Sequence, residues 1–562
     1  MRISRRSCSL ACLLALAACG RTESSAPSPS TIAPTVDYTL PPRRVTNGAP
    51  PMPVQSSPSG VASSTDGYVQ PQDGGPSREQ YNPITENEFQ DAAANPLSTF
   101  AIDVDAASYA NVRRFLLGTG QLPPRDAVRI EELVNYFDYD YPDPGGDAPF
   151  SITTEVAPAP WNPAHRLVHV GLQGRRMDAA SLPPANLVFL VDVSGSMDEP
   201  DKLPLLKEAF AMLVDNLRPQ DRVSIVAYAG AAGLVLPPTP GTQKDRIRDA
   251  ILTLQPSGST NGAEGIRLAY RLARDAFVRG GNNRVVLATD GDFNVGVSSD
   301  AELVRLIEQE RGGGVFLTVL GFGQGNLQDA KMEQLADRGN GNYAYVDGID
   351  EARKVLVGEM GGTLFTIAKD VKVQVEFNPA QVKAYRLIGY ENRLLAAEDF
   401  NDDRKDAGEL GAGHSVTALY EVVPAGAPDS PARGTDPLRY QTPRARSGAA
   451  DSGELLTVKL RYKAPDGDVS RLLAHPLHDR GAALAAASAD FRFSAAVAEW
   501  GMLLRDSRFR GGASYAAVRQ LARGALADDR GGYRAEFLRL VDASQRLASS
   551  GERHGEETVA DR

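Results

Sequence analysis

Apolar residues in the middle of the chain form short runs typical of strands, separated by longer runs typical of amphipathic helices. The runs NLVFLVDVS (186–194), RVSIVAYA (222–229) and RVVLATDG (284–291) are almost continuously apolar, as buried strands are. Between them, segments such as LPLLKEAFAMLVDNL and GAEGIRLAYRLARDAF repeat their apolar positions at helical spacing. Residues 184–368 are therefore predicted to form an α/β domain with a doubly wound, mostly parallel sheet. Such sheets bind ligands at the carboxyl ends of their strands.

Other regular patterns lie on both sides of this domain. Residues 86–149 have mainly helical spacing, and residues 150–183 alternate as strands do. Residues 369–476 also alternate, so we expect a β-rich domain in which these two sets of strands pair. Residues 477–548 are predicted to be a C-terminal helical region, followed by a tail at 549–562.

The first residues have the features of a bacterial export signal. Arg2, Arg5 and Arg6 precede the apolar run SLACLLALAA (9–18), which is too short to span a bilayer. Residues 1–18 are therefore predicted to be a signal peptide.

The end of this segment, Leu16-Ala17-Ala18-Cys19, resembles the lipobox of bacterial lipoproteins. The resemblance implies that Cys19 is acylated and becomes the first mature residue. The alternative is an ordinary signal cleaved beside an unrelated cysteine. Gly20 follows where lipoproteins kept at the inner membrane commonly have aspartate, so we expect a lipid anchor in the outer membrane, with the protein facing the periplasm.

Composition changes this picture in three ways. Residues 19–85 are rich in Pro, Ser, Thr and Gly, which predicts a disordered tether after the lipidated cysteine. All three cysteines (Cys8, Cys12 and Cys19) lie in the first nineteen residues, so the folded part has no thiol for a disulfide, a metal or catalysis. The formal net charge of -11 argues against nucleic acid as a partner.

Polar side chains are placed where strands of the predicted sheet end. The sequence DVSGS begins at Asp192, Thr260 lies in a later loop before a helix, and Asp290 ends a third strand. This combination resembles the metal-ion-dependent adhesion site of von Willebrand factor type A (VWA) domains. The resemblance implies that five side chains hold a divalent metal, namely Asp192, Ser194, Ser196, Thr260 and Asp290.

The chemistry of these side chains agrees with that assignment. Carboxylates and hydroxyls are hard oxygen ligands that suit Mg²⁺ or Mn²⁺ in six-fold coordination. Five such side chains leave a position open, where an Asp or Glu of a protein partner would bind the metal. The alternative is that Asp192 and Ser194 cap the following helix while Asp290 lies in an ordinary loop.

Another pair of carboxylates, Asp103 and Asp105, follows a short apolar strand. Haloacid dehalogenase phosphatases begin with a similar Asp-x-Asp, in which one carboxylate attacks phosphorus. Here Ala107 stands where that family has Thr or Val, and no parallel-sheet unit follows. We therefore expect these carboxylates to cap a helix N-terminus.

The resemblance extends to most of residues 88–548, which are similar to a family of bacterial VWA lipoproteins. The runs NPLSTFAIDVDAASYANVRRFL and DAVRIEELVNYFDYDYP carry it outside the metal motif. Three functions remain open: metal-dependent protein binding at the cell envelope, a structural or assembly role in which the metal only stabilises the fold, and a metal-dependent hydrolase or phosphatase. No nucleophile or general base accompanies the motif, so no catalytic residue is predicted and binding is favoured.

Overall fold

The computed structural model describes residues 79–560 except 260–261, 292–299, 360–364, 406, 429, 433–438, 441–445, 466 and 528. The predicted signal peptide, Cys19 and most of the predicted tether lie outside the described residues, as does Thr260. In the part of the chain that is described, no helix has the length and apolar character needed to cross a bilayer.

A six-stranded sheet forms the centre of the α/β domain, in the order β10-β9-β8-β5-β6-β7. All neighbouring strands are parallel except β7, which runs antiparallel to β6. The prediction of a doubly wound, mostly parallel sheet is thus confirmed. The strands are β5 (Ala185–Asp192), β6 (Arg222–Tyr228), β7 (Ala232–Pro240), β8 (Asn282–Thr289), β9 (Phe316–Phe322) and β10 (Tyr343–Val346).

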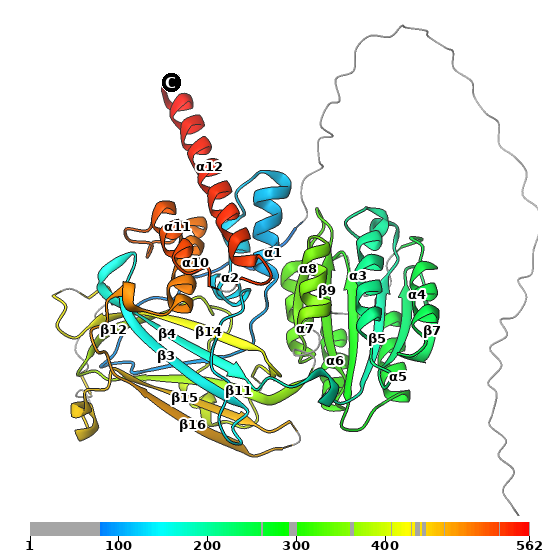
Figure 1. The fold of residues 1–562 in the computed structure, drawn as a ribbon, viewed down its shortest axis with the longest axis horizontal. Helices are drawn as coiled ribbons and strands as arrows, with labels where there is room; N and C mark the ends of the chain where they lie inside the picture. Colours follow the sequence, from blue (N-terminus) through cyan, green and yellow to red (C-terminus); the bar gives the residue numbers. More distant parts are fainter. Residues whose placement is uncertain are drawn as a thin grey trace, which may run out of the picture. The chain divides into compact units, whose positions relative to one another are not determined.

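Helices cover both faces of this sheet (Figure 1). On one face, α3, α4 and α8 pack around Phe189 and Val191, and on the other, α5, α6 and α7 pack around Val188 and Leu190. Successive side chains of a strand point to opposite faces of the sheet, and helices cover both faces here. Residues that point to either face are therefore apolar. The helices are α3 (Leu203–Asn216), α4 (Lys244–Leu252), α5 (Gly262–Asp275), α6 (Asp300–Gly312), α7 (Asp329–Arg338) and α8 (Ile349–Arg353), which η5 (Lys354–Glu359) continues.

Segments from both sides of the α/β domain form a β-sandwich of two antiparallel sheets. One has the order β1-β12-β14-β4-β3, and the other has the order β13-β11-β15-β16, with β2 also paired to β11. β4 pairs with β14 along its length, which is the pairing expected between residues 150–183 and 369–476. The strands are β1 (Gln90–Asp91), β2 (Leu97–Ala101), β3 (Phe150–Ala159), β4 (Asn162–Gly174), β11 (Thr366–Phe377), β12 (Val382–Ile388), β13 (Leu410–Gly411), β14 (Ser415–Pro424), β15 (Leu456–Lys463) and β16 (Ser470–Leu477).

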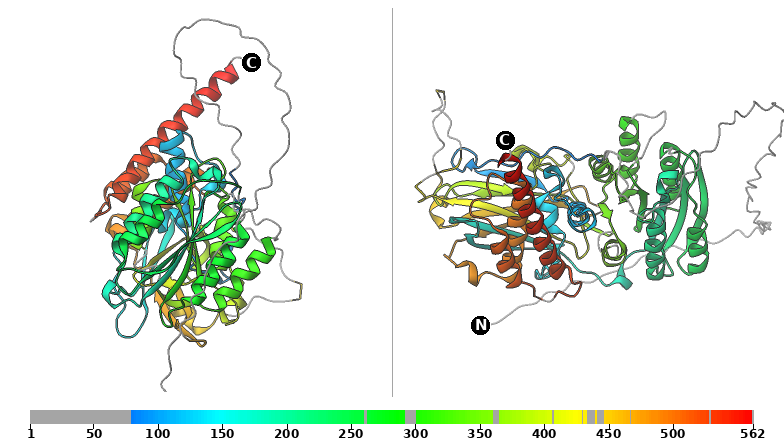
Figure 2. Two further views of the ribbon diagram at one scale, coloured as in Figure 1. Left: turned by 90° about the vertical axis from the view of Figure 1, so that its right-hand side faces the viewer. Right: turned by 90° about the horizontal axis from the view of Figure 1, so that it is seen from above.

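Helices from both ends of the chain share a second apolar core against this sandwich. Trp500 of α10 and Tyr109 of α1 are buried in it together with Leu167 of β4 and Leu419 of β14. Figure 2 shows α12 in red beside the orange helices that it contacts. The helices are α1 (Ala107–Arg113) continued by η1 (Arg114–Thr119), α2 (Ile130–Asn135), α10 (Ala489–Arg505), α11 (Tyr515–Arg523) and α12 (Tyr533–Ala560). Short 3-10 turns are η2 (Arg125–Ala127), η3 (Ala179–Ser181), η4 (Gly195–Asp198), η6 (Ala397–Asn401), η7 (Gly448–Ser452) and η8 (Leu484–Ala486).

The boundaries at both ends of the folded part differ from the sequence prediction. The backbone of α12 continues to Ala560, where a tail was predicted from residue 549. At the other end, Glu79 pairs with Arg114, and the Gln80 N–H donates to the Leu327 carbonyl. Contacts with distant residues hold this short polar segment, although its composition is that of a tether. Residues 79–85 therefore belong to the folded part of the chain, although the tether was predicted to extend to residue 85.

Candidate metal-binding site

Asp192 and Asp290 lie at the carboxyl ends of two neighbouring parallel strands. β5 and β8 are paired in register as far as Val191 and Ala288, so Asp192 reaches the same edge of the sheet as Asp290. Both residues are fully buried, with 0% of their surface exposed. Two carboxylates in such surroundings need hydrogen bonds or cations to remain charged.

The Asp192 carboxylate is held by donors from three strand ends. Its Oδ1 accepts from the Ser194 N–H at 2.9 Å, and its Oδ2 accepts from the hydroxyls of Tyr228 and Thr289, each at 3.1 Å. Burial raises the pKa of Asp192 to about 6, with the Asp290 carboxylate adding to the rise and the hydrogen bonds from Ser194 and Tyr228 opposing it. The carboxylate is thus oriented, and a cation beside it would favour its charged form.

Ser194 and Ser196 stand next to each other in the loop after β5. Their hydroxyl oxygens are 3.1 Å apart, with Ser194 buried and Ser196 half-buried. Two backbone hydrogen bonds fix a second loop against this one, from Gly195 N–H to the Gly258 carbonyl and from Ser257 N–H to the Val193 carbonyl. The loop that leads to the predicted ligand Thr260 therefore approaches the serines, although Thr260 itself is outside the described residues.

A third loop closes tightly on the residue after Asp290. Gly291 has a φ of +107°, and a Cβ there would lie 2.7 Å from both the Asn326 carbonyl oxygen and the Gln328 nitrogen. Only glycine accommodates both the backbone angle and the contact. The chain between β9 and α7 is thereby packed against this edge of the sheet.

Lys202 is a member of this site that the sequence did not reveal. It directly precedes α3, and its Nζ donates to Asp290 Oδ2 at 3.1 Å and to the Ser196 carbonyl at 2.9 Å. Its side chain is only 7% exposed. In the sequence it stands in the charged run DEPDK before an amphipathic helix, where lysines ordinarily extend into solvent.

The donors gathered here suit a hard divalent cation. The described side chains offer carboxylate and hydroxyl oxygens from Asp192, Ser194, Ser196 and Asp290, with neither thiolate nor imidazole among them. Mg²⁺ and Mn²⁺ prefer such ligands. The two buried carboxylates supply two negative charges to such an ion, one of which Lys202 offsets.

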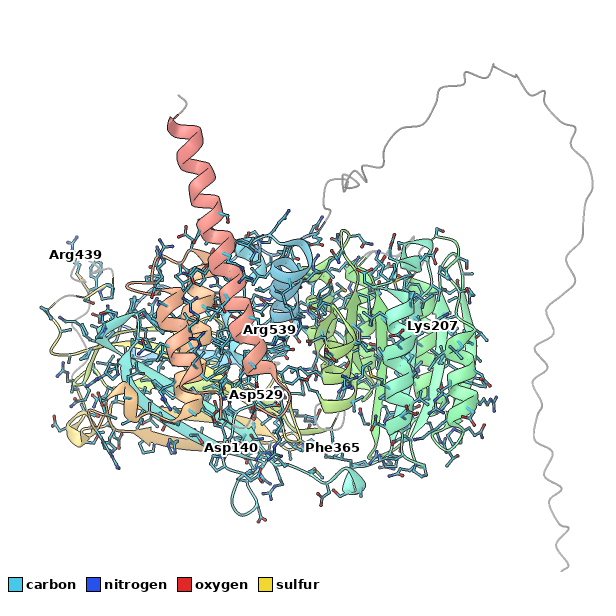
Figure 3. All side chains as sticks on the ribbon, turned by 45° about the horizontal axis from the view of Figure 1, so that its top comes forward. Asp140, Lys207, Phe365, Arg439, Asp529 and Arg539 are labelled. Carbon is cyan, nitrogen blue, oxygen red and sulfur yellow. The ribbon has the colours of Figure 1, made fainter. Side chains whose placement is uncertain are left out.

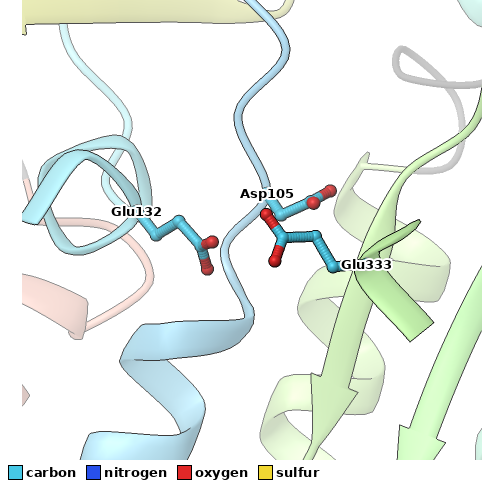
Figure 4. Close-up of side chains that lie close together, drawn as sticks. All are labelled: Asp105, Glu132 and Glu333. Atoms are coloured by element: carbon cyan, nitrogen blue, oxygen red, sulfur yellow. The ribbon is translucent and has the colours of Figure 1, made fainter. Parts of the chain in front are cut away.

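A separate group of carboxylates lies between the N-terminal region and α7. Asp105, Glu132 and Glu333 approach one another closely enough to hold a cation (Figure 4). However, Arg129 pairs with Glu132, and Arg393 lies 3.0 Å from Glu333 and 3.4 Å from Asp105. These guanidinium groups make the group a buried ion-pair network.

The expectation that Asp103 and Asp105 cap a helix is wrong. The residue before α1 is Ala106, and no side chain caps the helix there. Glu132 accepts from the Ser108 N–H instead, while Asp105 accepts from the Tyr343 N–H at 2.8 Å. The Asp105 carboxylate lies beside Arg393 and the backbone of β10, and it makes no hydrogen bond to the N-terminus of α1.

Three family models match successive parts of the chain. The model of von Willebrand factor matches residues 75–169, and that of the von Willebrand factor type A domain matches residues 187–292. The model described as uncharacterized protein YfbK, C-terminal, matches residues 362–547. The residues that the type A model matches include Asp192 and Asp290.

Comparison with known proteins gives matches of different extent. The uncharacterized protein YfbK of Escherichia coli (strain K12) is 45% identical over 474 residues, covering 83% of this chain and 81% of that protein. Inter-alpha-trypsin inhibitor heavy chain H4 of Homo sapiens is 27% identical over 161 residues, or 17% of that protein's length. Among solved structures, von Willebrand factor type A from Catenulispora acidiphila has a TM-score of 0.37 and 14% identity, with 81% of this chain and 91% of that chain covered.

Proposed function

Because the chain belongs to the YfbK family of bacterial VWA-domain proteins, we propose that it binds a protein partner through a divalent metal held in its α/β domain. The metal is Mg²⁺ or Mn²⁺, and the partner presents an Asp or Glu carboxylate to it. Asp192, Ser194, Ser196, Thr260 and Asp290 are the proposed metal ligands.

The observation that carries this proposal is the pair of fully buried carboxylates at adjacent strand ends. Three hydrogen bonds set the orientation of the Asp192 carboxylate. Asp290 is also fully buried and lies at the same edge of the sheet. Two buried charges of the same sign are costly, and the ion pair with Lys202 offsets only part of that cost. A divalent cation between them would offset that cost and would still accept a further anionic ligand.

Binding of metal and of carboxylate at one site makes the two affinities reciprocal. Each ligand must strengthen the binding of the other by the same factor. The metal is therefore expected to bind weakly alone and more firmly with a partner carboxylate. A purely structural metal, the alternative role, would bind with an affinity that is independent of added carboxylate.

Catalysis has less support than binding. The carboxylates that suggested phosphatase chemistry, Asp103 and Asp105, both form ion pairs with Arg393. Asp105 is 3% exposed, and its carboxylate also accepts from the Tyr343 N–H, so its oxygens are already engaged within the protein. We propose that the protein is not an enzyme.

The proposed place of action is the cell envelope. Acylation of Cys19 would anchor the chain to the outer membrane on its periplasmic side, and the extended tether rich in Pro and Ser would let the folded part stand clear of the membrane surface. The partner would then be another envelope protein.

Metal titration tests the proposal directly. Calorimetry of the purified full chain with Mn²⁺ should show one site, whose affinity increases when acetate is added as a model carboxylate. Asp290→Asn should abolish both effects, whereas Asp245→Asn should leave both unchanged, because the Asp245 side chain lies on α4 and is 96% exposed. Metal binding that is insensitive to acetate would reduce the metal to a structural role.

Crosslinking in the envelope tests the partner. Proteins captured by the wild-type chain from envelope membranes should be lost both with Asp192→Asn and after EDTA treatment. A partner retained under both conditions would contradict the mechanism.

A further inference from the structure

Lys202 brings a positive charge into the candidate metal site itself. Its Nζ is 3.1 Å from Asp290 Oδ2 and 2.9 Å from the Ser196 carbonyl oxygen, so it contacts both the strand end and the serine loop. Asp290 is fully buried, and the lysine side chain is 7% exposed. Solvent therefore screens this charge poorly, and any second cation bound at Asp290 is affected by it.

The lysine is held in place by more than its ion pair. Its stem passes across Gly323, where an added Cβ would collide with the lysine Cγ, Cδ and Cε. Gly323 has a φ of +75° and lies just after β9, on the same edge of the sheet as Asp290. Glycine at this position thus leaves a channel that the stem occupies, and the ammonium has little freedom to move away.

The charges of these side chains determine which combinations of metal ion and external carboxylate leave the site electrically neutral. Among the described side chains of the site, Asp192 and Asp290 contribute two negative charges and Lys202 one positive charge, which sums to one negative charge. A divalent cation changes this balance to one positive charge. One carboxylate from outside returns it to neutrality.

We propose that Lys202 acts as a resident cation that makes divalent metal binding depend on the partner's carboxylate. This inference rests on the proposed function, since it concerns the same metal and the same carboxylate. Without the lysine, the two aspartates alone would neutralise a divalent ion, and the metal would bind firmly whether or not a partner is present. With it, the metal and the carboxylate must arrive together.

Replacement of the lysine by a neutral side chain of similar length tests this idea. Full-length wild type and Lys202→Met are titrated with Mn²⁺ by calorimetry at pH 8, each without and with a high concentration of acetate. Lys202→Met should bind Mn²⁺ alone at least about tenfold more tightly than wild type, since a repulsive charge has been removed from a buried site. Acetate should strengthen Mn²⁺ binding by a smaller factor in the variant than in wild type.

Two matched variants control for other effects of the substitution. Lys207→Met removes the same charge further along α3, where the side chain is half-buried outside the site, and should behave as wild type (Figure 3). Lys202→Arg keeps the positive charge and should keep a strong dependence on acetate. If circular dichroism shows that Lys202→Met does not fold, Lys202→Gln removes the charge while keeping a donor for the Ser196 carbonyl.

The outcomes separate this inference from the proposed function. If wild type binds Mn²⁺ more tightly with acetate and the neutral variant does the same to the same extent, the role of Lys202 is refuted and the metal-dependent function stands. Weaker Mn²⁺ binding by the neutral variant would also refute it, since the lysine would then be a positioning residue for the ligands. If neither protein binds Mn²⁺ under either condition, both proposals fail.

Discussion

Arg129 and Asp329 form a buried ion pair that ties the N-terminal region to the α/β domain. Nη1 of Arg129 is 2.6 Å from Oδ2 of Asp329, and the two side chains are 6% and 0% exposed. Arg129 directly precedes α2 and also pairs with Glu132, whereas Asp329 is the first residue of α7. The loop that leads into α7 packs against Gly291, beside Asp290. The pair therefore fixes a helix whose preceding loop borders the candidate metal site.

Removal of this arginine should strongly destabilise the folded chain. Arg129→Met would leave Glu132 and Asp329 buried without their cation, and breaking a buried pair in this way costs about 3 to 5 kcal/mol. The free energy of unfolding, measured with urea and far-UV circular dichroism on the full chain, gives the loss.

A neighbouring arginine supplies the control for that measurement. Arg125 pairs with Asp506, but these side chains are 67% and 45% exposed. Arg125→Met should therefore cost at most about 1 kcal/mol, because solvent screens exposed pairs. Equal losses for the two variants would contradict the importance that we assign to the buried pair.

Loss of Asp290 should destabilise the chain through Lys202. Relief of repulsion between Asp192 and Asp290 would by itself favour the change, but Asp290→Ala also leaves the buried ammonium without its carboxylate. We expect a net loss of about 3 kcal/mol in urea unfolding, and recovery of most of it in the double variant Asp290→Ala/Lys202→Met. Additive losses in the double variant would show that the two side chains do not depend on each other.

The carboxyl group of Glu499 should make stability depend on pH. This residue of α10 is 0% exposed, and burial raises its pKa to about 7 from an ordinary value of 4.5. The folded chain then holds a proton that the unfolded chain releases, so stability is lost as pH rises from about 4.5 to about 7. Over that range the loss is at most about 3 kcal/mol.

Glu499→Gln carries no such proton and tests this expectation. Relative to wild type, the variant should gain stability between pH 5 and pH 8, by an amount approaching that loss. Urea unfolding of both proteins at the two pH values measures the difference. A difference that is the same at both would mean that Glu499 is ionised in the folded chain throughout.

Substitution of the predicted lipidation site should release the protein from membranes. Cys19→Ser removes the thiol that would carry the acyl groups, so the variant should lose incorporation of labelled fatty acid and move to the soluble fraction. Cys12→Ser, within the predicted signal peptide, should leave both unchanged. Retention of Cys19→Ser in salt-washed membranes would indicate another attachment.

Some features of this protein follow from the order of residues along the chain. Parallel strands with apolar side chains on both faces require helices on both faces, so the alternation in residues 184–368 was sufficient to predict the layers. All parallel strands end at one edge of their sheet. Asp192 and Asp290 could therefore be assigned to one site although the sequence separates them widely.

Other features depend on distances that the order of residues does not specify. Arg129 and Asp329 are 200 positions apart, and each is an ordinary charged residue near a helix start until the fold buries both. Asp105 was expected at a helix end for the same reason, whereas the fold gave it Arg393 and the backbone of Tyr343.

Lys202 shows most clearly how the environment expected from the sequence can differ from the environment in the folded chain. The run DEPDK before α3 has the composition of a solvated surface turn, so the sequence alone indicated a lysine in water. The close approach of Gly323 and the buried Asp290 carboxylate, 88 positions away, instead draw its ammonium into the site. The sequence by itself determined that the carboxylates of Asp192 and Asp290 lie at one edge of the sheet, because strand direction places them there. Only the tertiary structure decided the charge that they meet, because the position of a long flexible side chain depends on what packs around it.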